Sequence, residues 1–267
     1  MPFFSRDGIQ FHFRQTGEGV PFFFQHGLGG DVSQPFGLFT PPPDFQLLAF
    51  DCRAHGQTSP LGDPQKISFN SFSDDLLALM DHLAIQQAVI GGISMGAGVA
   101  LNFALRFPER TLGLLLQRPA WLAEGMRKNA DIYGFIARLI REHGAQAGLE
   151  HFRRSDIYKA MLAASPDCAN SLVSQFTQPR AEEAVIRLER MPPDAPTHDR
   201  AAWRKLGIQT LVLANRRDPI HPFEYGEVLA REIPGARFAE LTPKSASVEC
   251  HAAQVQQFIT QFLSNLC

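Results

Sequence analysis

The most informative part of the chain reads Gln87-Ala88-Val89-Ile90-Gly91-Gly92-Ile93-Ser94-Met95-Gly96. Residues 87–91 form a short, β-branched apolar run, which is typical of a buried strand. Residues 97–106 alternate at helical spacing and end just before Pro108. A strand, a G-x-S-x-G turn and a helix together indicate a nucleophile elbow, in which the serine hydroxyl projects above a sheet. Ser94 is therefore the candidate nucleophile; the alternative is an ordinary strand-to-helix turn that happens to contain a serine.

Three further segments each show an apolar run that enters a polar or glycine-rich turn. They are 21–25 before His26-Gly27-Leu28-Gly29-Gly30, 46–50 before Asp51-Cys52-Arg53-Ala54-His55-Gly56-Gln57-Thr58-Ser59, and 209–214 before Asn215-Arg216-Arg217-Asp218-Pro219-Ile220-His221-Pro222. These three segments and the elbow follow one another in a fixed order along the chain. With this combination the chain resembles the α/β-hydrolase superfamily, especially its small esterase, lactonase and cofactor-free haloperoxidase branch. The resemblance covers nearly the whole chain apart from its middle.

The resemblance implies an α/β fold: a mostly parallel α/β-hydrolase sheet with helices on both faces and a helical cap insertion. The patterns predict core strands near 9–14, 21–25, 46–50, 87–91, 112–117, 209–214 and 236–241, and helices near 71–84, 95–106, 222–232 and 252–265.

The middle of the chain interrupts this alternation of strands and helices. Residues 119–200 contain three or four helical patterns and then a proline-rich stretch at 191–196. We therefore expect a core of residues 1–118 and 201–267, and a helical cap at 119–200. In the family that the chain resembles, an insertion at this point covers the active site, so the pocket would lie between core and cap.

Acyl transfer needs a nucleophile, a base, a group that orients the base and donors for the oxyanion. The backbone N–H of Met95 starts the helix after Ser94 and so points at the pocket. The resemblance implies that the backbone N–H of Leu28 is the second donor and that Asp218 is the acid of the triad. It also implies structural roles for His26 and His55.

The base is the part of the triad that departs from the family pattern. The family places its histidine shortly after the last strand, and Ser245 stands there in this chain. Of His221 and His251, the two histidines beyond Asp218, only His251 follows the last predicted strand. We therefore expect a longer loop to bring His251 to Ser94 and Asp218. The alternative is that His251 is an ordinary residue at a helix start and that the triad is broken.

The expected function is hydrolysis of a small, mostly apolar ester, thioester or lactone through an acyl-enzyme on Ser94. Two alternatives stay open: a catalytically impaired ligand-binding member of the same fold, and a C–C hydrolase or haloperoxidase-like activity. No metal cluster or phosphate-cradling loop is visible, so no cofactor and no metal are expected. An apolar pocket is predicted from the aromatic residues of the loops and cap, Phe36, Phe39, Trp121, Phe135 and Phe152.

The composition agrees with one large α/β domain, because 267 residues with 45% hydrophobic content can fill a substantial core. A net charge of −2 with scattered Lys and Arg indicates a small-molecule substrate and no nucleic-acid or membrane partner. A homodimer is left open. The first residues show no signal-peptide pattern, and four widely spaced cysteines predict reduced thiols, so a cytoplasmic protein is expected. These cysteines are Cys52, Cys168, Cys250 and Cys267.

Overall fold

The computed structural model describes residues 2–126 and 128–266. The strands are β1 (Phe3–Arg6), β2 (Ile9–Thr16), β3 (Val20–Gln25), β4 (Phe45–Phe50), β5 (Ala88–Ile93), β6 (Thr111–Gln117), β7 (Thr210–Asn215) and β8 (Arg237–Leu241). The helices are α1 (Ser33–Leu38), α2 (Phe69–His82), α3 (Met95–Arg106), α4 (Ala130–Arg154), α5 (Asp156–Ala164), α6 (Pro166–Thr177), α7 (Ile186–Arg190), α8 (Phe223–Glu232) and α9 (Val248–Ser264). Short 3₁₀ turns are η1 (Pro64–Lys66), η2 (Pro108–Arg110) and η3 (Arg200–Lys205).

The strands of the described residues form one sheet in the order β1-β2-β4-β3-β5-β6-β7-β8. Only the pairs β1–β2 and β2–β4 are antiparallel; from β4 to β8 every neighbouring pair is parallel. Parallel neighbours need long crossover connections, and here helices supply them. The predicted fold class is confirmed. Strand β1 and helix α1 are additional elements that the sequence patterns did not reveal.

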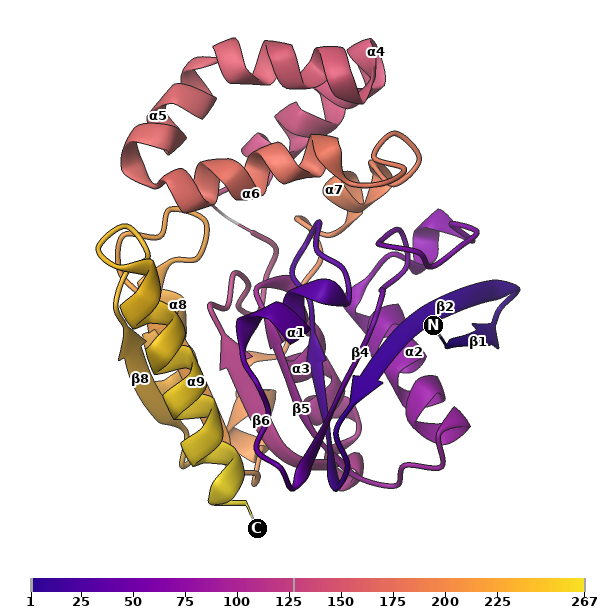
Figure 1. Cartoon of the computed structure of the whole chain (residues 1–267), viewed down its shortest axis with the longest axis vertical. Helices are drawn as coiled ribbons and strands as arrows, with labels where there is room; N and C mark the ends of the chain where they lie inside the picture. Colours follow the sequence, from indigo (N-terminus) through magenta and orange to yellow (C-terminus); the bar gives the residue numbers. More distant parts are fainter. Residues whose placement is uncertain (1, 127, 267) are drawn as a thin grey trace.

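Each face of the sheet is covered by its own layer of helices (Figure 1). Side chains alternate between the faces along a strand. On β3, Phe23 belongs to the apolar cluster that contains residues of α2 and α3, whereas Phe22 and Phe24 belong to the cluster that contains the buried face of α9. The consecutive phenylalanines of this strand therefore fill two separate apolar layers, as expected for a strand that is buried on both sides.

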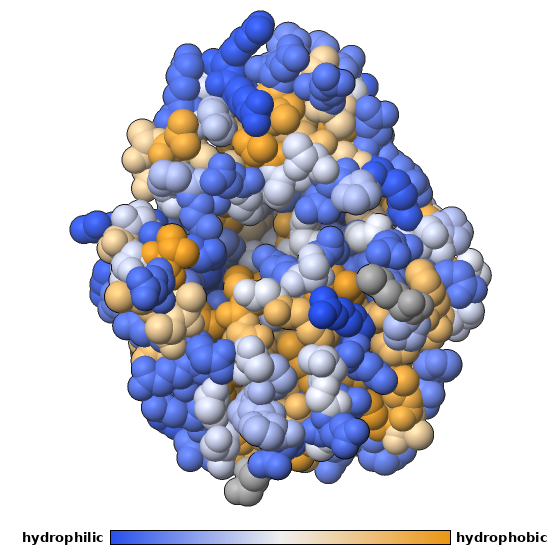
Figure 2. All heavy atoms as spheres, in the orientation of Figure 1, coloured by the Kyte–Doolittle hydropathy of each residue, from blue (hydrophilic) through white to orange (hydrophobic). Residues whose placement is uncertain are grey.

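Helices α4 to α7 lie together beyond one end of the sheet (Figure 1). We call residues 130–190 the helical segment. Its interior is aromatic: the ring of Phe152 lies 5.3 Å from that of Phe176 and 5.4 Å from that of Tyr158. Figure 2 shows a recess where the helical segment meets the sheet-containing part, on a face with many hydrophilic residues.

No helix in the described part of the chain is long and apolar enough to cross a bilayer. Cys52, Cys168 and Cys250 are free thiols, and Cys267 lies outside the described residues.

The glycines of the G-x-S-x-G turn are required by close backbone approach. A Cβ on Gly92 would lie 2.3 Å from the backbone of Gly96, and a Cβ on Gly96 would lie 2.1 Å from the carbonyl oxygen of Gln25. Both distances are far below van der Waals contact, and both involve backbone atoms that cannot rotate away. The start of α3 can therefore pack against the ends of β3 and β5 only because these side chains are absent.

This packing predicts opposite effects for two Gly→Ala substitutions. Gly96→Ala should destabilise the fold by about 2–4 kcal/mol, because a methyl group would overlap the backbone of Gln25. Gly134→Ala, on the exposed side of α4 with nothing within 4 Å of its Cβ, should stabilise by about 0.5–1 kcal/mol. Urea unfolding of both variants beside the wild type measures this. Equal effects would contradict the steric explanation.

Candidate active site

Ser94 lies at the sharp turn between β5 and α3. Its φ of 58° and ψ of −114° are unusual for a residue with a side chain. The turn is held on both sides: the Ser94 N–H donates to the carbonyl oxygen of Gln117 on β6 at 2.9 Å, and the Ser94 carbonyl accepts from the N–H of Ala97 at 3.1 Å. This backbone places the side chain at the end of the sheet, where it lines a cavity beneath α6. The predicted elbow geometry is present.

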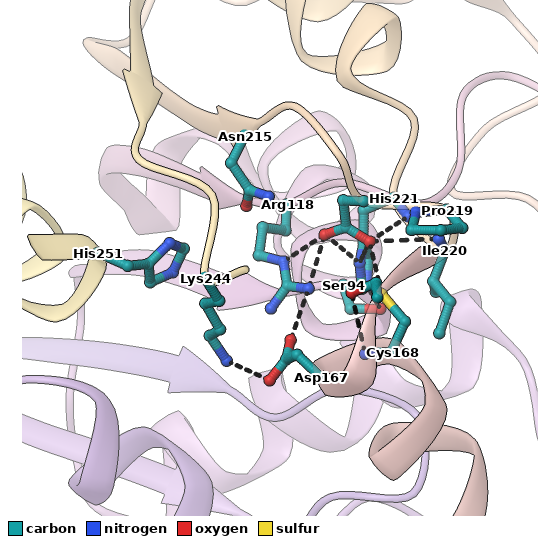
Figure 3. A network of polar contacts seen from close by, with 12 residues as sticks. Ser94, Arg118, Asp167, Cys168, Asn215, Pro219, Ile220, His221, Lys244 and His251 are labelled. Carbon is teal, nitrogen blue, oxygen red and sulfur yellow. Dashed lines mark hydrogen bonds and ion pairs between the residues drawn. The ribbon is translucent and has the colours of Figure 1, made fainter. Parts of the chain in front are cut away.

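The imidazole beside Ser94 belongs to His221 (Figure 3). His221 Nε2 lies 2.9 Å from Ser94 Oγ, and His221 Nδ1 lies 2.9 Å from both carboxylate oxygens of Asp218. Since an ionised carboxylate only accepts hydrogen bonds, Nδ1 carries the proton and Nε2 accepts from the serine hydroxyl. Serine, imidazole and carboxylate therefore form a continuous hydrogen-bonded series.

Asp218 and His221 are only three residues apart, and the carboxylate itself shapes the loop between them. Asp218 Oδ1 accepts from the backbone N–H of Ile220 at 3.2 Å and from that of His221 at 3.1 Å. Such side-chain to backbone bonds turn the chain back on itself. Asn129 braces the turn from outside, because its Nδ2 donates to the carbonyl oxygens of Pro219 and Ile220 at 3.0 and 3.2 Å.

The predicted contact between His251 and Ser94 is wrong. Ser247 caps α9 by accepting from the N–H of Cys250 at 3.1 Å, so the helix begins at Val248 and His251 lies in its first turn. The imidazole is turned back to the carbonyl oxygen of Thr242, with Nδ1 at 2.8 Å. In Figure 3, Lys244 and Arg118 lie between His251 and Ser94.

One signal in the sequence points to His221 instead. In Asp218-Pro219-Ile220-His221-Pro222, an aspartate followed by proline favours a turn that its own side chain closes. Such a turn brings the side chain three positions later back to the carboxylate. The prediction of His251 used only the spacing from the last strand. That spacing carries no information about a turn closed by the Asp218 side chain.

The backbone amides of Leu28 and Met95 lie in the turn before α1 and at the start of α3. Leu28 lines the cavity with Ser94, and Met95 is the first residue of α3. Neither N–H donates to another group within residues 2–126 and 128–266. The Leu28 carbonyl accepts from Gln175 Nε2 of α6 at 3.0 Å, which fixes the plane of the peptide that follows Leu28.

His26 and His55 are engaged by the backbone near the cavity. His26 Nδ1 donates to the carbonyl oxygen of Gly27 at 2.9 Å, and its Nε2 accepts from the N–H of Cys52 at 3.1 Å. His55 Nδ1 donates to the carbonyl oxygen of Arg53 at 2.9 Å. Burial lowers the pKa of both imidazoles, so they remain neutral. These contacts support the structural roles that the resemblance implied.

The cavity at Ser94 has a volume of about 100 Å³. It shares Leu28, Gln34, Asp167 and Ser171 with a second, more open cavity of about 300 Å³. Polar and charged side chains predominate among its lining residues, which are Gly27, Leu28, Gln34, Ile93, Ser94, Arg118, Tyr133, Asp167, Cys168, Ser171, Ile220, His221 and Lys244.

The expectation of an aromatic, apolar pocket is therefore wrong. Phe39 packs on Phe22 and Phe24 beside the sheet, with ring centroids at 5.7 and 5.2 Å. Trp121 packs on Phe69, and Phe135 packs on Phe152 inside the helical segment. The guanidinium of Arg14 covers the ring of Phe36. Phe39, Trp121 and Phe152 are buried in the cores, and Phe36 and Phe135 pack partly buried against them. None of the five lines the cavity at Ser94.

The electrostatics keep the imidazole neutral and the carboxylate ionised. Burial lowers the pKa of His221 below its ordinary value of 6.5, although the Asp218 carboxylate opposes this change. Burial alone would raise the pKa of Asp218. The charge that His221 carries when protonated and the charge of Arg118 outweigh that effect, together with hydrogen bonds from His221 and Cys168, and hold this pKa well below its usual range. At neutral pH the imidazole can therefore accept a proton.

Comparison with known proteins agrees with the fold. Residues 20–244 match the family model of the alpha/beta hydrolase fold. The chain belongs to the α/β-hydrolase family. Its α/β-hydrolase relatives include 3-oxoadipate enol-lactonase 2 of Acinetobacter baylyi, 27% identical over 213 residues that cover 79% of this chain and 76% of that protein.

Two more similar proteins match almost the full length of the chain. The chain is 26% identical to 2-hydroxymuconate semialdehyde hydrolase of a Pseudomonas species, over 96% of this chain and 91% of that protein. The crystal structure of the enol-lactonase from Burkholderia xenovorans LB400 has a TM-score of 0.75 at 23% identity, covering 98% of this chain and 100% of that one. The last likeness shows the fold alone.

The surroundings of His221 predict how its imidazole titrates. Its pKa should lie below 6.5 because of burial, and Asp218→Asn should lower it further, because the carboxylate that favours the protonated ring is lost. Titration of the ring nitrogens by ¹⁵N NMR measures both values, with His221→Ala identifying the signals. A His221 pKa above 6.5 in the wild type, or a rise in Asp218→Asn, would contradict this account of the site.

Proposed function

We propose that the chain is a serine hydrolase that cleaves a small ester, thioester or lactone through an acyl-enzyme on Ser94. The observation that carries the proposal is the position of His221: its Nε2 is 2.9 Å from Ser94 Oγ, while its Nδ1 is held by a buried carboxylate. A serine hydroxyl is a weak nucleophile unless an adjacent base accepts its proton. The alternative of a catalytically impaired, ligand-binding protein rests on Ser245 at the usual position of the histidine. The position of His221 supports an active hydrolase over that alternative.

In the proposed mechanism, Ser94 Oγ attacks the carbonyl carbon of the substrate while His221 Nε2 takes the hydroxyl proton. Asp218 keeps the proton on Nδ1 and stabilises the imidazolium that forms. The imidazolium then gives its proton to the leaving alcohol, thiol or ring oxygen as the carbonyl–heteroatom bond breaks. His221 next takes a proton from water as that water attacks the carbonyl carbon of the acyl-enzyme. The imidazolium then returns this proton to Ser94 Oγ as the bond between Oγ and the acyl carbon breaks and the acid is released.

The Leu28 and Met95 amides complete the proposed site as donors to the oxyanion. They have no competing acceptors in the described part of the chain, and Met95 adds the positive end of the α3 dipole. Gln175 of α6 fixes the Leu28 carbonyl, and Gln34 Oε1 accepts from the Gly27 N–H at 2.7 Å. A donor held in place before the reaction stabilises the transition state without reorganisation.

We also propose that the helical segment acts as a cap and limits the substrate to a small one. Residues Asp167, Cys168 and Ser171 of α6 and Tyr133 of α4 line the cavity at Ser94 from this side. The polar lining favours a substrate that can form hydrogen bonds over a long, purely apolar chain. The C–C hydrolase relative keeps carbon–carbon bond cleavage as a second candidate, because its likeness covers nearly the whole chain.

Four substitutions test the proposed triad. Ser94→Ala should abolish labelling by a fluorophosphonate probe. His221→Ala and Asp218→Asn should each lower kcat for p-nitrophenyl acetate by roughly a thousandfold or more, since base and orienter act as one unit. His251→Ala is the matched control and should keep near wild-type kcat, because that imidazole is bound to Thr242. Loss of activity in His251→Ala with full activity in His221→Ala would reverse the assignment.

A substrate series tests the size and chemistry of the cavity. With p-nitrophenyl esters, kcat/KM should be highest for acetyl or propionyl groups and fall at least about tenfold for octanoyl, because a cavity of about 100 Å³ cannot hold the longer chain. A small lactone and a vinylogous 1,5-diketone, assayed in parallel, separate ester or lactone hydrolysis from C–C cleavage. Preference for octanoyl esters would contradict the proposed size limit, and turnover of the diketone alone would select the second candidate.

A further inference from the structure

Four charged side chains in contact run from the loop after β8 to the proposed triad: Lys244, Asp167, Arg118 and Asp218. Figure 3 labels the first three of them. Lys244 Nζ lies 2.9 Å from Asp167 Oδ1, and Arg118 Nη2 lies 3.2 Å from Asp167 Oδ2. Arg118 also contacts Asp218 Oδ2, with Nε at 2.7 Å and Nη2 at 2.6 Å. Asp167 is in the first turn of α6, so this series connects the helical segment with the acid of the proposed triad.

Arg118 is buried at the end of β6, where its backbone has a φ of 47°. Its N–H donates to the carbonyl oxygen of Leu213 on β7 at 2.7 Å, which fixes this unusual conformation. The guanidinium is thereby aimed along the ends of the strands at Asp218. A positive φ is costly for a residue with a side chain, so the neighbouring contacts must maintain it.

The two oxygens of Asp218 have different donors. Oδ1 accepts from the amides of its own loop and lies 3.2 Å from the Cys168 thiol, whereas Oδ2 receives the guanidinium of Arg118. His221 Nδ1 is equidistant from both oxygens. Donors on both sides prevent rotation of the carboxylate, and that rotation would move the imidazole away from Ser94.

We propose that Arg118 is a positioning residue of the triad. It holds the Asp218 carboxylate in the orientation that faces His221, and its ion pair with Asp167 makes this orientation depend on how the cap packs on the core. The inference rests on the proposed function of Ser94, His221 and Asp218. In the described part of the chain, the guanidinium of Arg118 bonds to Asp218 and Asp167 and not to Ser94, so in this proposal it acts through Asp218.

The charges argue against a different role for Arg118 and Lys244 as a site for a substrate carboxylate. Within the described residues, these two cations are matched by Asp167 and Asp218, which they contact directly. A carboxylate ligand would have to displace one of these buried or half-buried partners and leave it unpaired, which is costly. The pairing therefore favours a role in positioning.

The network also sets the acidity of the base. Arg118 lowers the pKa of His221, whereas Asp218 and Asp167 raise it, and burial is the largest influence. The other titratable groups around the cavity are Tyr133 of α4, Cys168 of α6 and Lys244 of the loop after β8. Since the base must be neutral, activity is lost as the pH falls through the His221 pKa. Loss of the Arg118 charge should move this acid limb to higher pH, and loss of the Asp167 charge should move it to lower pH.

The pH dependence of fluorophosphonate labelling of Ser94 tests this pattern without knowledge of the substrate. Arg118→Gln should raise the midpoint of the acid limb by roughly one pH unit and lower the plateau rate about tenfold or more. Arg118→Lys should restore the midpoint, because the charge is kept, but not the full plateau, because the two-sided geometry is lost. Asp167→Asn should shift the midpoint the other way and by less.

Arg110→Gln is the matched control. Arg110 lies just before the other end of β6, pairs with Asp81 at 2.7 Å and is far along the strand from Ser94. It should leave both the midpoint and the plateau unchanged. Circular dichroism of every variant confirms that the fold is kept.

Several outcomes would overturn the inference. One is a uniform fall in rate for Arg118→Gln with no change in midpoint, which is what a merely structural residue gives. If Arg118→Gln does not fold, an unchanged midpoint and plateau in Asp167→Asn overturns it instead. If wild-type Ser94 is not labelled at all, the proposed function fails, and the His221 pKa by ¹⁵N NMR then decides separately: equal values in wild type and Arg118→Gln would refute the coupling.

Discussion

The hydrogen bonds between the Asp218 carboxylate and its own loop are the interaction on which the site depends. One side chain accepts from the amides of Ile220 and His221, orients the His221 ring and receives Arg118. A buried carboxylate is stable only when such donors replace its lost hydration. Because this carboxylate both folds the loop and holds the imidazole, acid and base of the proposed triad come from one short turn after β7.

The rest of the fold brings Ser94 to that turn. Strands β5, β6 and β7 are parallel neighbours, so the segments that follow them meet at one edge of the sheet. Ser94 follows β5, Arg118 follows β6 and the Asp218 loop follows β7. The unusual backbone angles of Ser94 and Arg118 are maintained by hydrogen bonds to the adjacent strands, and the glycine contacts of the elbow leave no room for relaxation.

The proposed cap also contacts the residues that position the site. Gln175 of α6 binds the Leu28 carbonyl, and Asp167 of the same helix binds Arg118, so one helix contacts both the proposed oxyanion loop and the residue that supports Asp218. Arg187 of α7 is fully buried and donates to the carbonyl oxygen of Ala54 at 3.0 Å, which ties this segment to the core. Through such contacts, the position of the helical segment on the core affects the geometry around Ser94.

The amino-acid sequence alone was enough for the fold class and the elbow at Ser94, because strand and helix periodicity and the glycines of a sharp turn are local properties. The candidate acid Asp218 came from the resemblance to the α/β-hydrolase superfamily. The sequence did not select the imidazole or the character of the pocket. Ser94 and His221 are 127 positions apart, and their contact depends on sheet register and on a turn closed by a side chain. Likewise, the phenylalanines of the loops and cap could face either a core or a pocket. Only tertiary packing sends them into the cores and leaves charged side chains around Ser94, because burial stabilises the aromatic rings most where they are fully enclosed.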